Sequence, residues 1–250
     1  MFKSFRIILL ISLIFFTTTK VNAQIIDLEV SASTFSINPK VGTPAGHSRT
    51  GHIIDEVHGD LKTTLFLFKH GDDKFCLVTS PMGVHYSGQL NNFCVEKISS
   101  SLNIPKEAIV TNSSHDHTIP LIDVSDKGRP EKGSPELLPW ELGREFIAGF
   151  EKSVNFIAEN LTPVTVEWGV AEENRITYNR KGRRIDGSTY FMREEDRLDI
   201  AGEGYHGLID PDAVVVVFKN YDGKPVAALT FFTGHPVAAY NPEKMISYGQ

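Results

Sequence analysis

Two histidines separated by a single residue, His115 and His117, have the clearest potential for chemistry in this chain. They lie in residues 113–118, which directly follow residues 107–112, a stretch with the character of a strand leaving a core. In an extended chain, side chains two residues apart point to the same side at a Cα separation of about 6.5–7 Å, so both imidazoles could reach one ion. A catalytic zinc takes three protein ligands and keeps a position open for water, so the pair supplies at most part of a site. The same spacing also arises by chance among ordinary loop histidines.

A third histidine, His235, ends another apolar run at residues 231–236. In open α/β sheets, ligands bind beyond the carboxyl ends of strands, so two strands running the same way could bring His115 and His235 to one crevice. Gly234, directly before His235, would allow backbone to approach closely there. The sequence therefore predicts that these two distant histidines share a site.

Two β-hairpins are predicted from apolar runs that flank short polar turns. The first pairs residues 65–68 with 75–78, and the second pairs residues 213–218 with 226–232. Both hairpins have continuously apolar strands, which are typical of strands covered on both faces. In addition, Val164, Val166, Trp168 and Val170 alternate with other residues, as in a half-buried strand.

Two helices are predicted from apolar residues that recur at helical spacing. These residues are Leu90, Phe93, Cys94, Ile98 and Leu102 in the first helix, and Leu142, Phe146, Ile147, Phe150, Val154, Ile157 and Leu161 in the second. We interpret both stripes as core positions. The predicted fold class is therefore α/β, with mixed, largely buried β-sheets that contain β-hairpins and are packed by helices. Three irregular stretches, residues 38–49, 118–139 and 174–205, are the loops in which chemistry is expected.

The amino terminus has the organisation of a secretory signal peptide. Residues 1–6 are basic, residues 7–16 are apolar, and residues 21–23 provide small or compact side chains for cleavage. We therefore predict a signal peptide at residues 1–23, an exported protein that is periplasmic or secreted, and one domain over residues 24–250. An uncleaved membrane anchor is the alternative, although the apolar segment is short for a bilayer span, and no stable span is expected after cleavage.

Charge and cysteine content limit the possible partners. The net charge is −6 and the basic residues are scattered apart from residues 180–184, so nucleic acid, which needs a concentrated basic face, is not an expected partner. Cys76 and Cys94 could pair in an oxidising compartment. Both also lie on predicted apolar faces, where buried free thiols are common.

Several short motifs, taken in their order, resemble those of the neutral/alkaline non-lysosomal ceramidase family, in its N-terminal catalytic domain and its shorter bacterial relatives. The motifs extend over nearly the whole chain after residue 23. They are Asn38-Pro39 with Gly42, Pro44, Gly46 and Arg49; Ser114-His115-Asp116-His117-Thr118; Asn179-Arg180; Asp210-Pro211; Asp222-Gly223-Lys224-Pro225; and Gly234-His235-Pro236.

The resemblance implies a zinc-dependent amidohydrolase that cuts the N-acyl amide bond of ceramide-like sphingolipids. It implies that His115 and His235 are zinc ligands, that His117 is a catalytic residue beside the metal, and that Arg180 lines the site. For His117, direct ligation or a hydrogen bond behind the ligands stays an alternative, and Arg180 could be an ordinary surface arginine. Zn²⁺ is the implied cofactor, and a ceramide-like lipid or another N-acyl amide is the implied substrate.

The chain departs from the family pattern at three places. Asp116 stands where the family commonly has threonine, residues 118–120 replace a more usual Ser-Gly-Pro, and an acidic residue expected near residues 78–83 is not found. On an ideal strand Asp116 would point away from the two histidines, where it could bind a second cation. The resemblance therefore supports the fold more strongly than it supports a particular substrate.

The chain ends at Gln250, about where the relatives continue into further zinc ligands, a glutamate and a tyrosine, and a serine associated with activity. We therefore expect a fragment of a longer chain rather than a shortened homologue with an altered site, and we expect weak metal retention and little turnover. Two other classes stay open: an exported binding protein without metal, and a metal-dependent hydrolase of another bond. Zinc dialysis and assays on ceramide, simple amides and aryl phosphates would distinguish them.

Overall fold

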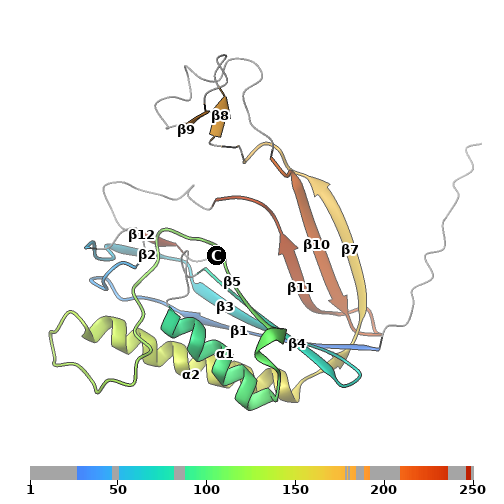
Figure 1. The fold of residues 1–250 in the computed structure, drawn as a ribbon, viewed down its shortest axis with the longest axis horizontal. Helices are drawn as coiled ribbons and strands as arrows, with labels where there is room; N and C mark the ends of the chain where they lie inside the picture. The colour runs from blue at the N-terminus through green and yellow to red at the C-terminus, as the bar shows by residue number, and fades with distance from the viewer. Residues whose placement is uncertain are drawn as a thin grey trace, which may run out of the picture.

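The computed structural model describes residues 27–46, 51–81, 88–177, 179, 181–183, 189–191, 209–235 and 246–248. In this part of the chain, two helices lie under a five-stranded sheet, and a separate three-stranded sheet rises from one end of it (Figure 1). The predicted signal peptide lies outside the described residues. Neither described helix combines the length and apolar character that a membrane crossing requires.

The five-stranded sheet is mixed and has the order β5-β4-β3-β1-β6. Its strands are β1 (Leu28–Ile37), β3 (Leu61–His70), β4 (Asp73–Ser80), β5 (Ile109–Ser113) and β6 (Thr162–Pro163). β1, β3 and β4 pair antiparallel, whereas β5 pairs parallel with β4 after a helical crossover. The predicted first hairpin is confirmed as β3 and β4, which turn at Gly71 with a φ of 58°.

Two helices, α1 (Gly88–Leu102) and α2 (Leu137–Glu159), cover one face of this sheet and enclose the main core. The predicted stripes are confirmed: Leu90, Cys94, Ile98 and Leu102 are buried in α1, and Leu142, Phe146, Phe150, Val154 and Ile157 are buried in α2. Phe146 and Phe150 stack at 5.7 Å between ring centroids, and the Phe35 ring of β1 packs edge-on against both. The core therefore fixes β1 and α2 to each other. Its two cysteines, Cys76 and Cys94, are buried free thiols.

The three-stranded sheet is antiparallel, in the order β11-β10-β7, with β7 (Thr165–Glu172), β10 (Asp212–Lys219) and β11 (Pro225–Phe231). The predicted second hairpin is confirmed as β10 and β11. A small cluster of Val30, Val164 and Phe218 joins this sheet to the other face of the five-stranded sheet. Phe218 and Phe68 meet there at 5.4 Å between ring centroids.

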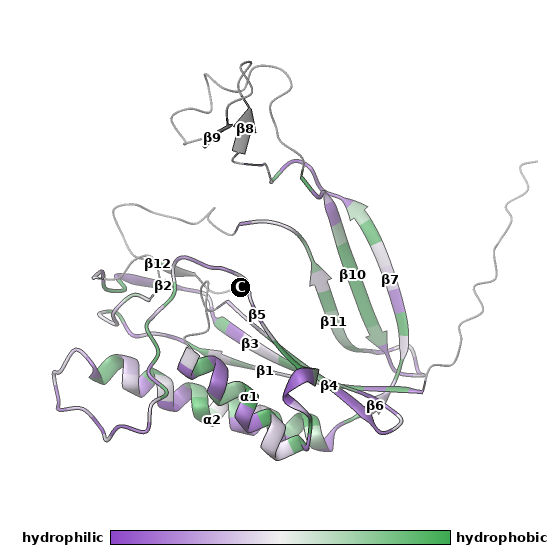
Figure 2. Ribbon diagram, in the orientation of Figure 1, coloured by the Kyte–Doolittle hydropathy of each residue, from purple (hydrophilic) through white to green (hydrophobic). Residues whose placement is uncertain are grey.

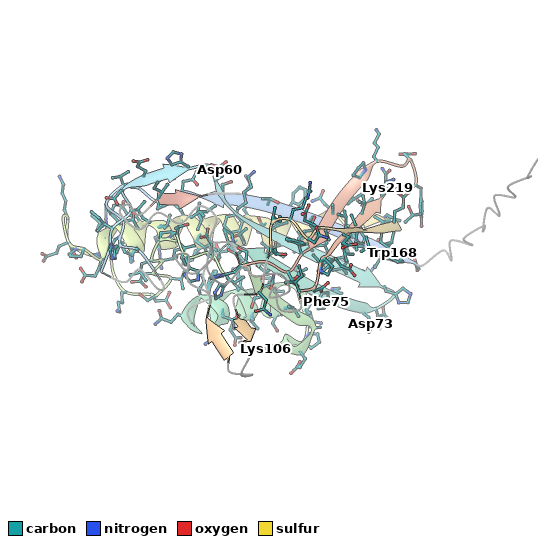
Figure 3. All side chains as sticks on the ribbon, turned by 90° about the horizontal axis from the view of Figure 1, so that it is seen from above. Asp60, Asp73, Phe75, Lys106, Trp168 and Lys219 are labelled. Atoms are coloured by element: carbon teal, nitrogen blue, oxygen red, sulfur yellow. The ribbon has the colours of Figure 1, made fainter. Side chains whose placement is uncertain are left out.

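Two expectations about burial were wrong for the second sheet, because β10 and β11 are not covered on both faces and β7 is not half-buried. Every residue of β7 is exposed, including Trp168 at 72% (Figure 3), although Val164 just before the strand is buried. β10 buries only Phe218, yet hydrophobic residues run along it (Figure 2). The apolar pattern thus identified the strands correctly, but the part of the chain that the structure describes covers them only at the Phe218 end.

Short elements complete the described part. A 3-10 helix η2 (Lys106–Ala108) leads into β5, and two strand pairs join β2 (Glu56–His58) with β12 (Ile246–Tyr248) and β8 (Lys181–Arg183) with β9 (Thr189–Phe191). The loop after β1 bridges to the loop after β5 through Ala45 and Pro120. A side chain at Gly46 would meet the Pro120 carbonyl oxygen at 2.9 Å, so these two loops need glycine at that position.

Candidate metal centre

Three imidazole rings meet beyond the ends of β5 and β11. The ring centroids of His115, His117 and His235 lie 4.7–5.0 Å apart pairwise. Nε2 of His235 lies 2.8 Å from Nε2 of His117. All three side chains are half-buried, and one nitrogen from each lies within 4.8 Å of the others. The predicted meeting of His115 and His235 is therefore observed, and His117 is equally close.

The His115–His117 pair does not lie on an extended chain, contrary to the expectation from sequence. β5 ends at Ser113, and its parallel pairing with β4 is prolonged only by the Ser114 amide, which donates to the Ser80 carbonyl at 3.0 Å. His115 then adopts a left-handed backbone with a φ of 65°. A turn, and not the pleat of a strand, therefore brings the two rings together.

Asp116 serves this turn. Its Oδ1 accepts hydrogen bonds from the Thr118 amide at 2.9 Å and from Thr118 Oγ1 at 2.8 Å. This is an Asx-type arrangement, in which the side chain replaces a backbone partner two residues on. The carboxylate therefore has a structural partner in the loop, which explains its presence between two histidines without a second cation.

His235 comes from a different sheet. β11 ends at Phe231, and the Thr233 hydroxyl donates to the Asp210 carbonyl at 2.6 Å, which ties this segment to the start of β10. The site thus combines segments that follow strands of two different sheets, and it does not lie along the carboxyl edge of one open sheet as the sequence suggested. Figure 1 shows the chain after β11 arching towards the end of β5.

The donor set fits a zinc ion. Zinc binds imidazole nitrogen at about 2.0–2.1 Å in tetrahedral geometry, which sets neighbouring nitrogens about 3.3 Å apart. The observed 2.8 Å between two of the nitrogens and the 4.8 Å limit on the set bracket that value. Three imidazole nitrogens match the number of protein ligands in a catalytic zinc site, in which water takes the fourth position.

Arg180, the other predicted site residue, lies outside the described residues, although its neighbour Asn179 is described. Sequence reasoning also missed Thr177, whose side chain lies against Gly234. No motif marks a threonine in a loop, so only the position of β11 next to this segment could have identified it.

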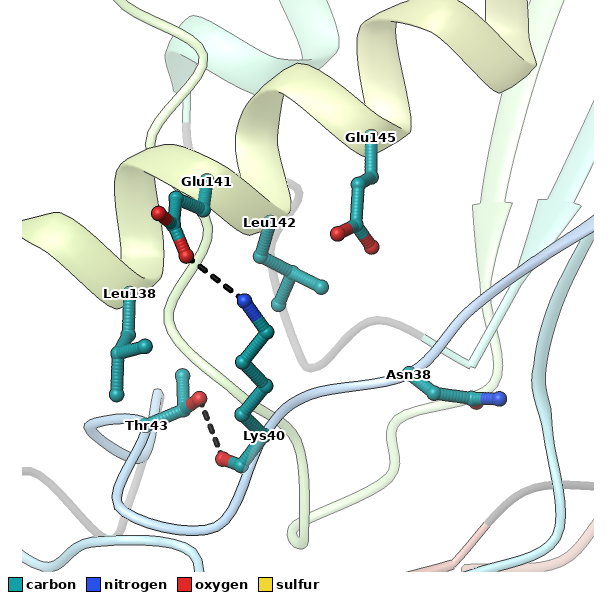
Figure 4. A pocket seen from close by; sticks show the side chains of 7 residues that line it. All are labelled: Asn38, Lys40, Thr43, Leu138, Glu141, Leu142 and Glu145. Atoms are coloured by element: carbon teal, nitrogen blue, oxygen red, sulfur yellow. Dashed lines mark hydrogen bonds and ion pairs between the residues drawn. The ribbon is translucent and has the colours of Figure 1, made fainter. Parts of the chain in front are cut away.

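A second place with ionisable side chains lies between the loop after β1 and α2 (Figure 4). Nζ of Lys40 lies 2.9 Å from Oε2 of Glu141, and this hydrogen bond holds the pKa of the Glu141 carboxyl below its ordinary value. The hollow has a volume of only about 10 Å³, which admits one water at most. It is an ion pair that fastens the loop to α2, and it has no room for a substrate.

Comparison with protein-family models gave no match, and comparison with curated protein sequences gave none either. Two solved structures are similar in fold. A ceramidase complexed with C2 aligns with a TM-score of 0.59 at 12% identity, over 90% of this chain and 37% of that one. The neutral ceramidase from Pseudomonas aeruginosa aligns with a TM-score of 0.54 at 14% identity, over 90% of this chain and 38% of that one. The chain thus spans less than two fifths of either ceramidase, and the fold that it adopts is that of a neutral ceramidase-like domain.

Proposed function

We propose that this protein is an exported, zinc-dependent amidohydrolase that cleaves the N-acyl amide bond of ceramide-like sphingolipids. The observation that carries the proposal is the meeting of His115, His117 and His235 in a domain with a neutral ceramidase-like fold. Export through a signal peptide at residues 1–23 and a domain over residues 24–250 belong to the same proposal.

In this proposal His115 and His235 hold the ion, and His117 lies beside it. When bound, zinc polarises the amide carbonyl and lowers the pKa of water to about 7. His117 lies 2.8 Å from His235 through their Nε2 atoms, so it can either complete the three-imidazole set or accept the proton of the attacking water. Arg180 would stabilise the negative charge that develops on the substrate oxygen.

Zinc binding by the 250-residue chain tests the metal part. We expect about one zinc per chain in equilibrium dialysis, because three imidazoles are available where the sequence alone predicted two. Replacement of His115 or His235 by alanine should weaken binding at least tenfold. His70→Ala is the matched control, since His70 is an exposed histidine at the end of β3.

His117→Ala separates the two roles of that residue. Weaker zinc binding would make His117 a ligand, whereas normal zinc binding with lost turnover would make it the proton acceptor. Wild-type protein that retains no zinc at stoichiometric concentration would refute the proposed metal site.

The substrate part is tested with labelled ceramide, simple N-acyl amides and aryl phosphates offered to a zinc-loaded, full-length version of the protein, because little turnover is expected from the 250-residue chain alone. The proposal expects zinc-dependent release of fatty acid from ceramide and none of phosphate from the aryl esters. Cleavage of aryl phosphates without cleavage of amides would indicate a metal-dependent hydrolase of another bond. Ligand binding that His115→Ala and His235→Ala leave unchanged would indicate a binding protein.

A further inference from the structure

A threonine hydroxyl lies buried beside the histidine that β11 brings to the centre. Thr177 belongs to the loop after β7, and its Cγ2 lies 3.3 Å from where a Cβ at Gly234 would stand. Gly234 directly precedes His235, and a side chain at Gly234 would crowd Thr177. The contact places a hydroxyl-bearing side chain next to the backbone that carries the ring.

The Thr177 hydroxyl is buried and has no hydrogen-bond partner among the described residues. A buried hydroxyl without a partner is unfavourable, so a partner that forms in another state of the protein would account for it. Thr177 lies against Gly234, the residue before His235, and here the other state is the one with the ion bound.

The His235 ring has a second nitrogen that could donate a hydrogen bond to the Thr177 hydroxyl. Its Nε2 faces Nε2 of His117 inside the cluster, which leaves Nδ1, also buried, as the nitrogen directed away from it. A neutral imidazole that ligates through one nitrogen carries its proton on the other. That N–H generally donates to an oxygen acceptor, which orients the ring and makes the ligating nitrogen more basic.

We propose that Thr177 is a positioning residue for the metal centre: when zinc binds, its Oγ1 accepts a hydrogen bond from Nδ1–H of His235. This inference rests on the proposed zinc site and adds to it a residue outside the histidine cluster. The hydroxyl acts through His235 and does not touch the ion or the substrate.

The test compares Thr177→Val, which keeps the shape and removes the hydroxyl, with Thr177→Ser, which keeps the hydroxyl. We expect Thr177→Val to weaken zinc binding about 10- to 100-fold, the range typical of partners behind the ligands, and Thr177→Ser to bind nearly as wild type. The melting temperature of the metal-free protein should be unchanged or slightly higher in Thr177→Val, because the hydroxyl has no partner in that state.

Two further measurements exclude a purely structural effect. Ser31→Ala is the matched control: Ser31 also has a buried hydroxyl without a partner among the described residues, but it lies on β1 beside the end of α2. Nitrogen NMR of the His235 ring in zinc-loaded protein should show the proton on Nδ1 in wild type and a changed Nδ1–H signal in Thr177→Val.

The outcomes separate this inference from the proposed function. If wild type binds no zinc, both are wrong. If wild type binds zinc and Thr177→Val binds it equally well, the metal site stands and the role of Thr177 is refuted. A parallel loss of metal-free stability and zinc affinity in Thr177→Val would also refute it, because that pattern belongs to a packing residue.

Discussion

At the scale of single residues, the centre depends on an unfavourable backbone. A left-handed conformation costs a residue with a Cβ roughly 1–2 kcal/mol, and His115 adopts it with a φ of 65°. Such conformations concentrate at functional sites, where the surroundings hold them in place. Here the Asp116–Thr118 hydrogen bonds and the pairing of Ser114 with Ser80 hold the turn from both sides.

The strain predicts a reversal in the usual order of two substitutions. At most positions glycine makes a protein less stable than alanine does, but glycine adopts positive φ freely. We therefore expect metal-free His115→Gly to have a free energy of unfolding about 1 kcal/mol higher than that of His115→Ala, measured in urea. Asn112, inside β5, is the control position: there, Asn112→Ala should be more stable than Asn112→Gly. Equal stability of the two His115 variants would mean that the turn relaxes in the protein.

The buried thiols give a second prediction at this scale. Burial raises the pKa of the Cys76 thiol to about 12, and burial also raises the pKa of Cys94. Only the thiolate reacts with disulfide reagents, so native protein at pH 8 should react with DTNB very slowly. After unfolding, both thiols should react within seconds to minutes. Absence of reaction in unfolded protein that has not been reduced would indicate a disulfide.

At the scale of elements, two glycines in α2 allow other parts of the chain to pack closely against the helix. A Cβ at Gly143 would lie 1.8 Å from the Asp123 carbonyl oxygen, and a Cβ at Gly149 would lie 2.4 Å from the Phe35 ring. The first contact brings the loop after the histidine turn against the helix, and the second brings β1 against it. The absence of side chains at these two positions therefore determines how closely the helix packs against the loop and against β1.

Gly143→Ala should destabilise the protein by at least about 1–3 kcal/mol, because the added methyl group meets backbone that cannot rotate away. Gly88→Ala is the matched control: no atom of the described residues lies within 4 Å of its added Cβ, so the change should be neutral or stabilising. Both are measured as chemical denaturation midpoints. A Gly143→Ala variant as stable as wild type would show that the Asp123 loop moves freely.

The sequence predicted the helices and strands better than it predicted the contacts and turns that tertiary packing determines. Hairpins and helical stripes depend on neighbours along the chain, so β3–β4, β10–β11, α1 and α2 were recognised correctly. The exposure of β7 depends on which segments pack against it, and no local pattern records that. The left-handed turn at His115 and the contact between Thr177 and Gly234 were missed for the same reason, because tertiary contacts determine both.

At the scale of the whole molecule, the second sheet presents an open apolar face. Val170, Val214 and Phe231 lie opposite one another in register across its three strands, and Trp168 lies opposite Val216. Trp168, Val170 and Phe231 are all exposed, and large exposed apolar patches promote association. The described part of the chain thus leaves hydrophobic surface in contact with water.

Replacing Trp168 by threonine should reduce binding of the dye ANS and reduce self-association in sedimentation velocity. The free energy of unfolding should change by less than about 0.5 kcal/mol, because the side chain is 72% exposed. Phe156→Thr is a useful comparison, since Phe156 is an exposed aromatic residue on α2 and not on a strand of this sheet. Equal dye binding by Trp168→Thr and wild type would show that the sheet is covered in solution.

The small apolar joint formed by Val30, Val164 and Phe218 lies where the two sheets meet, so its packing affects the angle between them. His235 extends from the end of β11, while His115 and His117 follow β5 in the other sheet. A tilt of a few degrees at the joint would be magnified along the length of the strands and would spread the three nitrogens apart. The affinity for a metal ion would then depend on side-chain packing at a joint that does not contact the ion.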